Sequence, residues 1–274
     1  MKKYKPTTPS MRSRRITDKS HLSQKGPTKK LIRILKKTTG RDHGTISVRH
    51  RGGGNMRKYR MIDFKRFGKL NIEATVTTLE YDPYRSANIA LLTYQDGDRL
   101  YIIAPHELKV GDSVICAETA KIKIGNALPL KSIPVGIGIH NLELNLGQGG
   151  IIVRSAGQQA KVLAKDAGMV QIKLPSGEVR LVSELCYATI GQVSNIEHNQ
   201  RVLGKAGAVR WIRRRPQVRG TAMSAGDHPH GGGEGRTGTG RVPRTVYGKP
   251  AYGVRTRKPH KMSDKFIVKT KRQK

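Results

Sequence analysis

The positive charge of this chain is confined to its two ends. Residues 1–60 contain 19 Lys or Arg against 2 Asp or Glu, and residues 201–274 contain 20 against 3. Residues 61–200 contain 14 of each sign and are neutral. The overall net charge of +34 opposes a compact monomer by self-repulsion, which indicates a polyanionic partner. A neutral centre can fold by burying apolar surface, whereas we expect the two basic extensions to order only against a polyanion.

Short β-rich runs separated by turn signals recur through the neutral centre. The expected strands lie within residues Leu70–Tyr81, Ala87–Tyr94, Leu100–Ala104, Ser113–Ala117, Ile137–Leu146, Ile151–Ser155, Lys161–Ala164, Met169–Leu174 and Glu178–Val182. Asp96-Gly97 and Pro175-Ser176-Gly177 have the composition of hairpin turns. Polar and apolar residues alternate from Asn71 to Leu79, as in a strand with one wet face. This pattern predicts a mainly β chain built of small antiparallel barrels.

The Gly- and Pro-containing stretch Gly125–Gly138 is the expected seam between two barrels. We therefore predict four parts: a basic extension over 1–60, a first barrel over 61–128, a second barrel over 129–200, and a Gly/Arg-rich extension over 201–274. In the extensions, only Leu31–Leu35 and Arg201–Trp211 have the pattern of a short helix or strand.

Several segments combine charge with glycine or an aromatic ring, as nucleic-acid contacts do. Lys and Arg neutralise phosphates, and glycine permits a close backbone approach. Trp211 beside a run of arginines suits base stacking, although a core anchor is an equal alternative. The predicted RNA-binding residues of the extensions are Arg49, His50, Arg51, Gly52, Gly53, Gly54, Lys205, Arg210, Trp211, Arg213, Arg219, His228, His230 and Arg236.

Two arginines of the neutral centre stand in loops, where barrels of this type carry oligonucleotide contacts. Arg85, with Ser86, lies between two expected strands, and Arg154 lies at the end of another. We predict that Arg85, Ser86 and Arg154 contact RNA, against the alternative of ordinary surface charges.

The segment Asp227–Glu234 most resembles an active site. His228 and His230 between two carboxylates could bind a metal or act as acid and base. An extension without its own core cannot supply the water-excluding pocket that catalysis needs, so we predict no catalytic residue and no metal site. The motif Gly233–Gly238 fits the dinucleotide pattern literally, but no strand precedes it.

The cysteines, the apolar runs and the first 15 residues indicate the cellular compartment of the protein. Cys116 and Cys186 form no disulfide framework, and we expect both to be small buried residues in a reducing compartment. No apolar run approaches the roughly 20 residues of a membrane span, and Met1–Arg15 lacks the apolar stretch of a secretory signal. An organellar transit peptide is an alternative, because that class is also basic and Ser-rich, but Met1–Arg15 has no clear amphipathic helix. We expect a cytoplasmic protein without a membrane partner.

From end to end, the chain resembles the family of the second protein of the large ribosomal subunit, in its bacterial form. The matching segments are Gly40–Gly54, Tyr59–Arg66, Tyr81–Ala87, Arg154–Gly157, Gly204–Gly207, Arg219–Met223, Asp227–Gly235 and Ser263–Val268. Several long matches in the correct order are highly specific.

The resemblance implies an oligonucleotide-binding-fold (OB) barrel followed by an SH3-like barrel, with extensions that enter large-subunit RNA near the peptidyl-transferase centre. It implies roles in subunit association, transfer RNA placement and support of peptide-bond formation, with RNA performing the chemistry and no cofactor in the protein. The implied partners are large-subunit ribosomal RNA, neighbouring ribosomal proteins and small-subunit RNA at an intersubunit bridge. Arg85 and Arg154 become the core RNA contacts, and His228 the extension residue nearest the catalytic RNA. Whether magnesium bridges the extensions to phosphates stays open.

The sequence departs from the family at two places. Asn55-Met56 stand where His-Lys is usual, which removes an RNA or cation contact. Ser224-Ala225-Gly226 stand where Asn-Pro-Val is usual, which we expect to loosen the approach to His228. Two other functions remain as alternatives: a metal-dependent hydrolase that uses Asp227, His228, His230 and Glu234, and a DNA-compacting protein.

Overall fold

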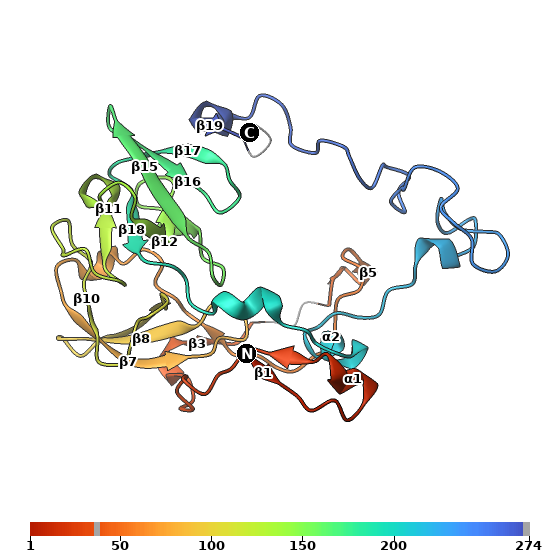
Figure 1. The fold of residues 1–274 in the computed structure, drawn as a ribbon, viewed down its shortest axis with the longest axis horizontal. Coiled ribbons are helices and arrows are strands. Elements are labelled where there is room, and N and C mark those ends of the chain that lie inside the picture. Colours follow the sequence, from red (N-terminus) through yellow and green to blue (C-terminus); the bar gives the residue numbers. More distant parts are fainter. Residues whose placement is uncertain (36–38, 271–274) are drawn as a thin grey trace. The chain divides into compact units, whose positions relative to one another are not determined.

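The computed structural model describes residues 1–35 and 39–270 and divides into two compact units (Figure 1). The first unit comprises the described residues of the stretches 1–36, 56–204 and 263–274, and the second those of 37–55 and 205–262. The first unit contains two large antiparallel sheets and three strand pairs, and the second consists mainly of loops.

The first sheet of the first unit has four antiparallel strands in the order β10-β7-β8-β9. The strands are β7 (Ala74–Glu80), β8 (Ile89–Tyr94), β9 (Arg99–Ile103) and β10 (Ser113–Val114). The Asp96-Gly97 turn between β8 and β9 is confirmed, since the Gly97 amide donates to the Tyr94 carbonyl at 3.0 Å.

The predicted alternation along β7 holds for its first half. Ala74 and Val76 are buried, whereas Thr75 and Thr77 are exposed. A register shift between Val76 and Thr78 then changes the phase, so that Leu79 packs on the cluster of Ala74 and Val76, whereas the buried Glu80 accepts a hydrogen bond from the Tyr101 hydroxyl. An irregularity of this kind re-aims the side chains that follow it, and a simple alternation pattern does not reveal its position.

The second sheet has seven strands in the order β11-β18-β12-β15-β16-β17-β19, all antiparallel. They are β11 (Ala127–Pro129), β12 (Gly138–His140), β15 (Ala160–Asp166), β16 (Met169–Lys173), β17 (Val179–Ser183), β18 (Tyr187–Ile190) and β19 (Ile267–Lys269). The predicted turn at Pro175–Gly177 is confirmed by a Gly177 N–H to Leu174 carbonyl hydrogen bond of 2.9 Å. Neither β11 nor β18 was predicted, and β11 spans the predicted boundary at residue 128.

Each sheet encloses its own apolar cluster. Buried residues of the first cluster include Val76, Leu92 and Val114. The larger second cluster contains the following residues: Leu128, Leu130, Ile133, Ile139, Leu142, Val153, Ala160, Val162, Val170, Ile172, Val182, Cys186, Ala188 and Ile190. Cys116 and Cys186 are buried and unbonded to each other, as expected.

The two extensions contribute more to the first unit than predicted. β19, near the C-terminus, pairs with β17 at the edge of the second sheet (Figure 1). Near the N-terminus, Leu22 is buried and the Ser23 amide donates to the Leu79 carbonyl at 2.7 Å. The sequence predicted no periodic pattern longer than a few residues in these segments, and the elements observed there are correspondingly short.

The remaining elements of the first unit are short. They are β1 (Lys2–Lys3), α1 (Pro9–Arg12), β2 (Arg15–Ile16), η1 (Lys29–Leu31), β3 (Ile32–Arg33), β6 (Tyr59–Arg60), η2 (Phe67–Lys69), η3 (Leu130–Ser132), β13 (Leu142–Glu143), β14 (Gly150–Ile152) and η4 (Ile196–Gln200). β1 pairs with β2, β3 with β6, and β13 with β14. The 3₁₀ turn η6 (Met262–Phe266) precedes β19.

The second unit has little regular structure. It contains β4 (Arg41–Asp42), β5 (Thr45–Ile46), α2 (Ala206–Trp211) and η5 (Gly220–Ala222). α2 falls where a short element was predicted. Ala208 is the one buried hydrophobic residue of this unit within the described part of the chain. Hydrogen bonds within loops therefore organise this unit.

Candidate nucleic-acid interface

The second unit brings together two of the predicted RNA-binding segments. The Arg215 amide donates to the His50 carbonyl at 3.1 Å, and Arg51 and Arg214 form an antiparallel bridge. The side chains of Arg49, Arg51 and Arg214 remain exposed. Two segments more than 150 residues apart thus form one positively charged surface. We call this surface of Arg49, Arg51 and Arg214 the cationic strip, and its charge suits an extended polyanion.

Gly54 is required by this pairing. Its φ is +78°, and a Cβ would lie 2.5 Å from Arg213 Cγ and 2.8 Å from the Trp211 carbonyl oxygen. Gly53, with φ +66°, faces open space instead. We predicted that the glycines permit approach to nucleic acid, but Gly54 permits approach to the protein's own backbone.

Trp211 is 54% exposed, so the alternative that it anchors a core is wrong. It ends α2, and Lys205 Nζ lies 5.0 Å from the ring centroid. Arg210, in the same last turn, is exposed. The indole therefore stands at the surface beside cations, where a base can stack on it.

The segment from Arg219 to Arg236 is a compact loop. The Gly231 amide donates to the His228 carbonyl at 2.8 Å, and the Gly232 amide to the Met223 carbonyl at 3.0 Å. The His228 ring packs on Gly220, where a Cβ would lie 2.5 Å from it. Arg219 and Arg236 are exposed.

The unusual Ser224-Ala225-Gly226 sequence begins with a residue that forms two hydrogen bonds within this loop. The Ser224 hydroxyl donates to Asp227 Oδ2 at 2.8 Å, and the Asp227 amide donates to the Ser224 carbonyl at 3.1 Å.

The two histidines of this loop already have protein partners. Their rings are 5.0 Å apart, with the His230 amide donating to His228 Nδ1 and the Arg244 amide donating to His230 Nε2. Residues 1–35 and 39–270 contain no group of three or more His, Cys, Asp or Glu that could hold a metal ion. Both ring nitrogens that accept these amides are thereby engaged within the protein.

In the first unit, Arg85 is held tightly. Its Nη1 pairs with Asp82, whose side chain is fully buried, and its Nη2 donates to the Tyr59 hydroxyl at 3.1 Å. The guanidinium also lies 5.2 Å from the Tyr59 ring centroid. With 15% of its side chain exposed, Arg85 is mainly a structural cation.

Ser86 also forms hydrogen bonds within the protein. Its hydroxyl accepts from the Ala156 amide at 3.1 Å, and its carbonyl accepts from Asn195 Nδ2 at 2.6 Å. Ser86 therefore ties the loop of Arg85 to the loop of Arg154.

Arg154 is held by weaker partners. Its Nη1 donates to the Gly150 carbonyl at 3.1 Å, and its Cζ lies 4.5 Å from the Phe64 ring centroid. Burial and then the charge of Arg85 lower the pKa of the Arg154 guanidinium from its ordinary value. Within the described part of the chain, Arg154 has no ion-pair partner. Its positive charge is therefore available to an anion.

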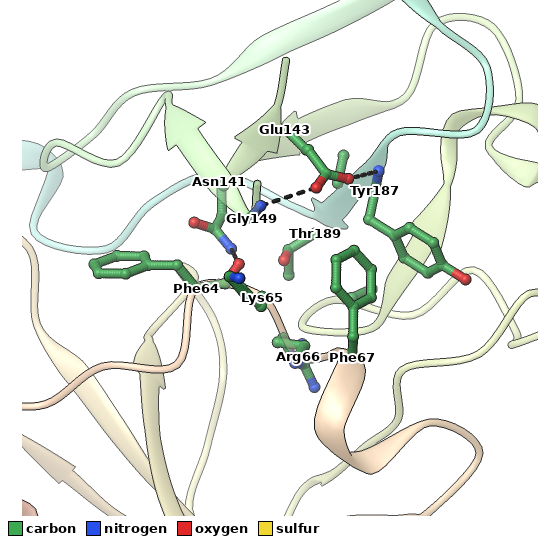
Figure 2. Close-up of a pocket in the computed structure, with 12 residues that line it drawn as sticks. Phe64, Lys65, Arg66, Phe67, Asn141, Glu143, Gly149, Tyr187 and Thr189 are labelled. Carbon is green, nitrogen blue, oxygen red and sulfur yellow. Dashed lines mark hydrogen bonds between the residues drawn. The ribbon is translucent and has the colours of Figure 1, made fainter. Parts of the chain in front are cut away.

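A small cavity beside Phe64 is structural. About 10 Å³ of space, room for one water molecule, lies among Phe64–Phe67, Asn141, Glu143 and Tyr187 (Figure 2). The buried Glu143 accepts the Gly149 amide at 2.8 Å and the Tyr187 amide at 3.0 Å. Both carboxylate oxygens are thus used to join loops, and the cavity offers no site for a substrate.

The aromatic residues around the two core arginines were not predicted from the sequence. Arg57 lies 4.8 Å from the Tyr84 ring centroid, and Tyr84 packs edge-on against Tyr59. The aromatic residues within Tyr59–Arg66 and Tyr81–Ala87 gave a usable signal, because aromatic rings among arginines favour cation–π contacts.

Two family models match the chain. Residues 28–116 match Ribosomal Proteins L2, RNA binding N-terminal domain, and residues 123–248 match Ribosomal Proteins L2, C-terminal domain. The chain belongs to the ribosomal protein L2 family. The mainly β architecture agrees with the OB and SH3-like barrels of L2, as predicted.

Membership of the L2 family establishes the general role. The chain is a large-subunit ribosomal protein of translation that binds ribosomal RNA, has ribosomal proteins as neighbours, and comes from a structural protein family. It is therefore located in the ribosome. No helix in the described ranges is long and apolar enough to cross a membrane.

Proposed function

We propose that this L2-family chain supports subunit association, transfer RNA placement and the peptidyl-transferase region by ordering large-subunit RNA. The second unit carries the proposal: it contains 18 Lys or Arg against 3 Asp or Glu and almost no apolar core. A surface of this kind binds phosphates by releasing counterions. RNA performs the chemistry, and the protein contributes no catalytic residue.

The residues divide by role within this proposal. The cationic strip and the surface around Trp211 contact phosphates and bases of the large-subunit RNA. The proposed contact of the first unit is Arg154, with Arg85 supporting it. His228, held in its loop, lies nearest the catalytic RNA.

The proposed role also involves small-subunit RNA as a partner and requires no cofactor. The chain also reaches small-subunit RNA at an intersubunit bridge and works in the cytoplasm. No cofactor of its own is needed, and magnesium acts only where it bridges RNA phosphates. Chelation of magnesium should then change RNA folding without removing a stoichiometric metal from the purified protein, which metal analysis measures.

Co-sedimentation of the chain with large subunits through a high-salt wash tests the role most directly. We expect the wild-type chain to stay with the subunit, since its extensions are enclosed by RNA. A His228→Ala variant should also stay bound while peptide-bond formation or transfer RNA binding by the reconstituted subunit declines. Equal affinity for duplex DNA and structured ribosomal RNA would support the DNA-compacting alternative instead.

A further inference from the structure

The Phe64 ring lies between two guanidinium groups. Arg154 Cζ is 4.5 Å and Arg85 Cζ is 5.6 Å from its centroid, both within the range of cation–π attraction. Arg85 stands in the connection between β7 and β8 of the first sheet, and Arg154 follows β14 in the second half of the unit. Phe64 belongs to neither loop, so one ring joins two cations from distant parts of the chain.

The two cations differ in how they are neutralised. Arg85 is paired with the buried Asp82, and Arg154 lacks an ion-pair partner among the residues described. Arg85 also repels Arg154, because both are positive and both approach Phe64. Besides the ring contact, Arg154 donates a hydrogen bond to the Gly150 carbonyl, which is the one side-chain hydrogen bond found for it among the described residues.

The backbone of Phe64 is fixed by the same strand that holds Arg154. The Phe64 carbonyl accepts from the Gly150 amide at 3.0 Å and from Asn141 Nδ2 at 3.3 Å. Gly150 therefore holds the Phe64 backbone through its amide and the Arg154 side chain through its carbonyl. Figure 2 shows the Phe64 ring directed away from the neighbouring Phe67 ring, which packs edge-on against Tyr187 at 4.9 Å.

We infer that Phe64 is a positioning residue that orients the unpaired Arg154 guanidinium for an RNA phosphate. This inference rests on the proposed RNA contact of Arg154. A planar guanidinium must present its N–H groups in a fixed direction to bind a phosphate with two hydrogen bonds. The ring contact and the hydrogen bond from Nη1 to the Gly150 carbonyl together fix the guanidinium, so that its other N–H groups can face the phosphate.

A purely structural role is the competing explanation, since Phe64 also packs against the cluster of Ala87, Ile103 and Val193. The two explanations differ in one respect. If Phe64 acts through Arg154, its removal must have no effect on RNA binding once Arg154 is gone. If it only supports the fold, the effects must add.

The experiment uses the full chain and a full-length transcript of large-subunit ribosomal RNA as the probe. Affinity is measured against salt concentration for Phe64→Leu, Arg154→Gln, the double variant, and Phe64→Tyr. Phe67→Leu is the matched control, because it removes an aromatic ring from the same segment that contacts no guanidinium within the described part of the chain. Urea unfolding of each variant measures stability in parallel.

We expect Phe64→Leu to weaken binding about fivefold with an unchanged salt slope, and Phe64→Tyr to restore it. Arg154→Gln should lower the slope by about 1, as for the loss of one phosphate contact. The double variant should bind as Arg154→Gln does, and Phe67→Leu as the wild type does.

Additive losses in the double variant, or an equal loss in Phe67→Leu, would overturn the positioning role and leave the RNA contact of Arg154 intact. An Arg154→Gln variant with wild-type affinity and slope would remove that contact from the proposed function, and the positioning role with it.

Discussion

The two units of this chain are stabilised in different ways. The first unit encloses two apolar clusters under antiparallel sheets and satisfies buried carboxylates such as Glu80 and Glu143 by hydrogen bonds. The second unit has one buried hydrophobic residue among those described, Ala208, and loops that are closed by backbone hydrogen bonds. We therefore expect the first unit to fold by itself, and the second to gain its stability from the RNA that it binds. A ribosomal protein can in this way fold before assembly and complete its structure within the RNA.

The largest expected effect is the dependence of RNA affinity on salt, which reflects the positive charge of the second unit. With six or more phosphates neutralised, RNA affinity should fall about 1,000-fold between 50 and 200 mM salt. Replacing Arg213, Arg214 and Arg215 by Gln should lower the salt slope by about 3, measured by filter binding. The control replaces Lys109, Lys161 and Lys173, exposed in the first unit, and should change the slope by less than about 1. Equal changes in the two triple variants would contradict the division of roles.

The next effect concerns the core of the first unit. Glu143→Ala removes the acceptor of two buried amides, those of Gly149 and Tyr187, and should lower the free energy of unfolding by about 4 kcal/mol. Glu118→Ala is the control, since its exposed ion pair with Lys131 contributes less than about 1 kcal/mol. Urea unfolding followed by circular dichroism measures both. Similar values for the two variants would show that Glu143 does not support the fold.

A pH effect should also be confined to the first unit. Burial, with a smaller contribution from the charge of Arg66, lowers the pKa of His140 from 6.5 to about 4. The neutral imidazole is favoured in the folded state, so its contribution is complete above pH 6.5 and is lost as the pH falls toward 4. The free energy of unfolding should fall by about 3 kcal/mol over this interval through this residue. The measurement is urea unfolding at several pH values.

A His140→Leu variant provides the comparison for this pH effect. Its free energy of unfolding should depend less on pH between 6.5 and 4 than that of the wild type. The exposed His106→Leu is the matched control and should follow the wild-type profile. A His140→Leu profile parallel to that of the wild type would exclude His140 as the cause.

The smallest effect concerns the second unit. Gly54→Ala places a Cβ against Arg213 and the Trp211 carbonyl and should weaken RNA binding about fivefold or more by opening the bridge between Arg51 and Arg214. Gly53 has a similar positive φ, but a Cβ there would face open space, so Gly53→Ala should lose less RNA affinity. Neither should change the unfolding of the first unit. Equal losses of RNA affinity in the two variants would show that the bridge between Arg51 and Arg214 does not contribute to RNA binding.

Local patterns predicted a large part of the fold. The Asp96-Gly97 and Pro175–Gly177 turns were found because hairpins of this kind depend on nearby residues alone. β11 was missed because Ala127-Leu128-Pro129 lies in a stretch rich in Gly and Pro, and β19 because three residues of a charged extension give no periodic signal. Both strands depend on partners far away in the sequence, as in the pairing of β19 with β17.

The sequence predicted the positive charge of the candidate site but not the side-chain contacts within it. The cationic segments followed from composition, and the L2 family match supports their general role. The ion pair of Arg85 with Asp82 was accessible in principle, since the two are three residues apart in one turn. The contact of Phe64 with both Arg85 and Arg154 was not accessible, because tertiary packing alone brings these residues together.

Hydrogen exchange on the full chain, free and bound to large-subunit RNA, tests the central claim most directly. In the free chain, amides of the sheets between residues 74 and 190 should be protected, and those of 205–262 should exchange rapidly. Binding of RNA should slow exchange across 205–262 and leave the sheets nearly unchanged. Strong protection of 205–262 in the free chain would contradict the account, because the second unit would then be stable without a polyanion.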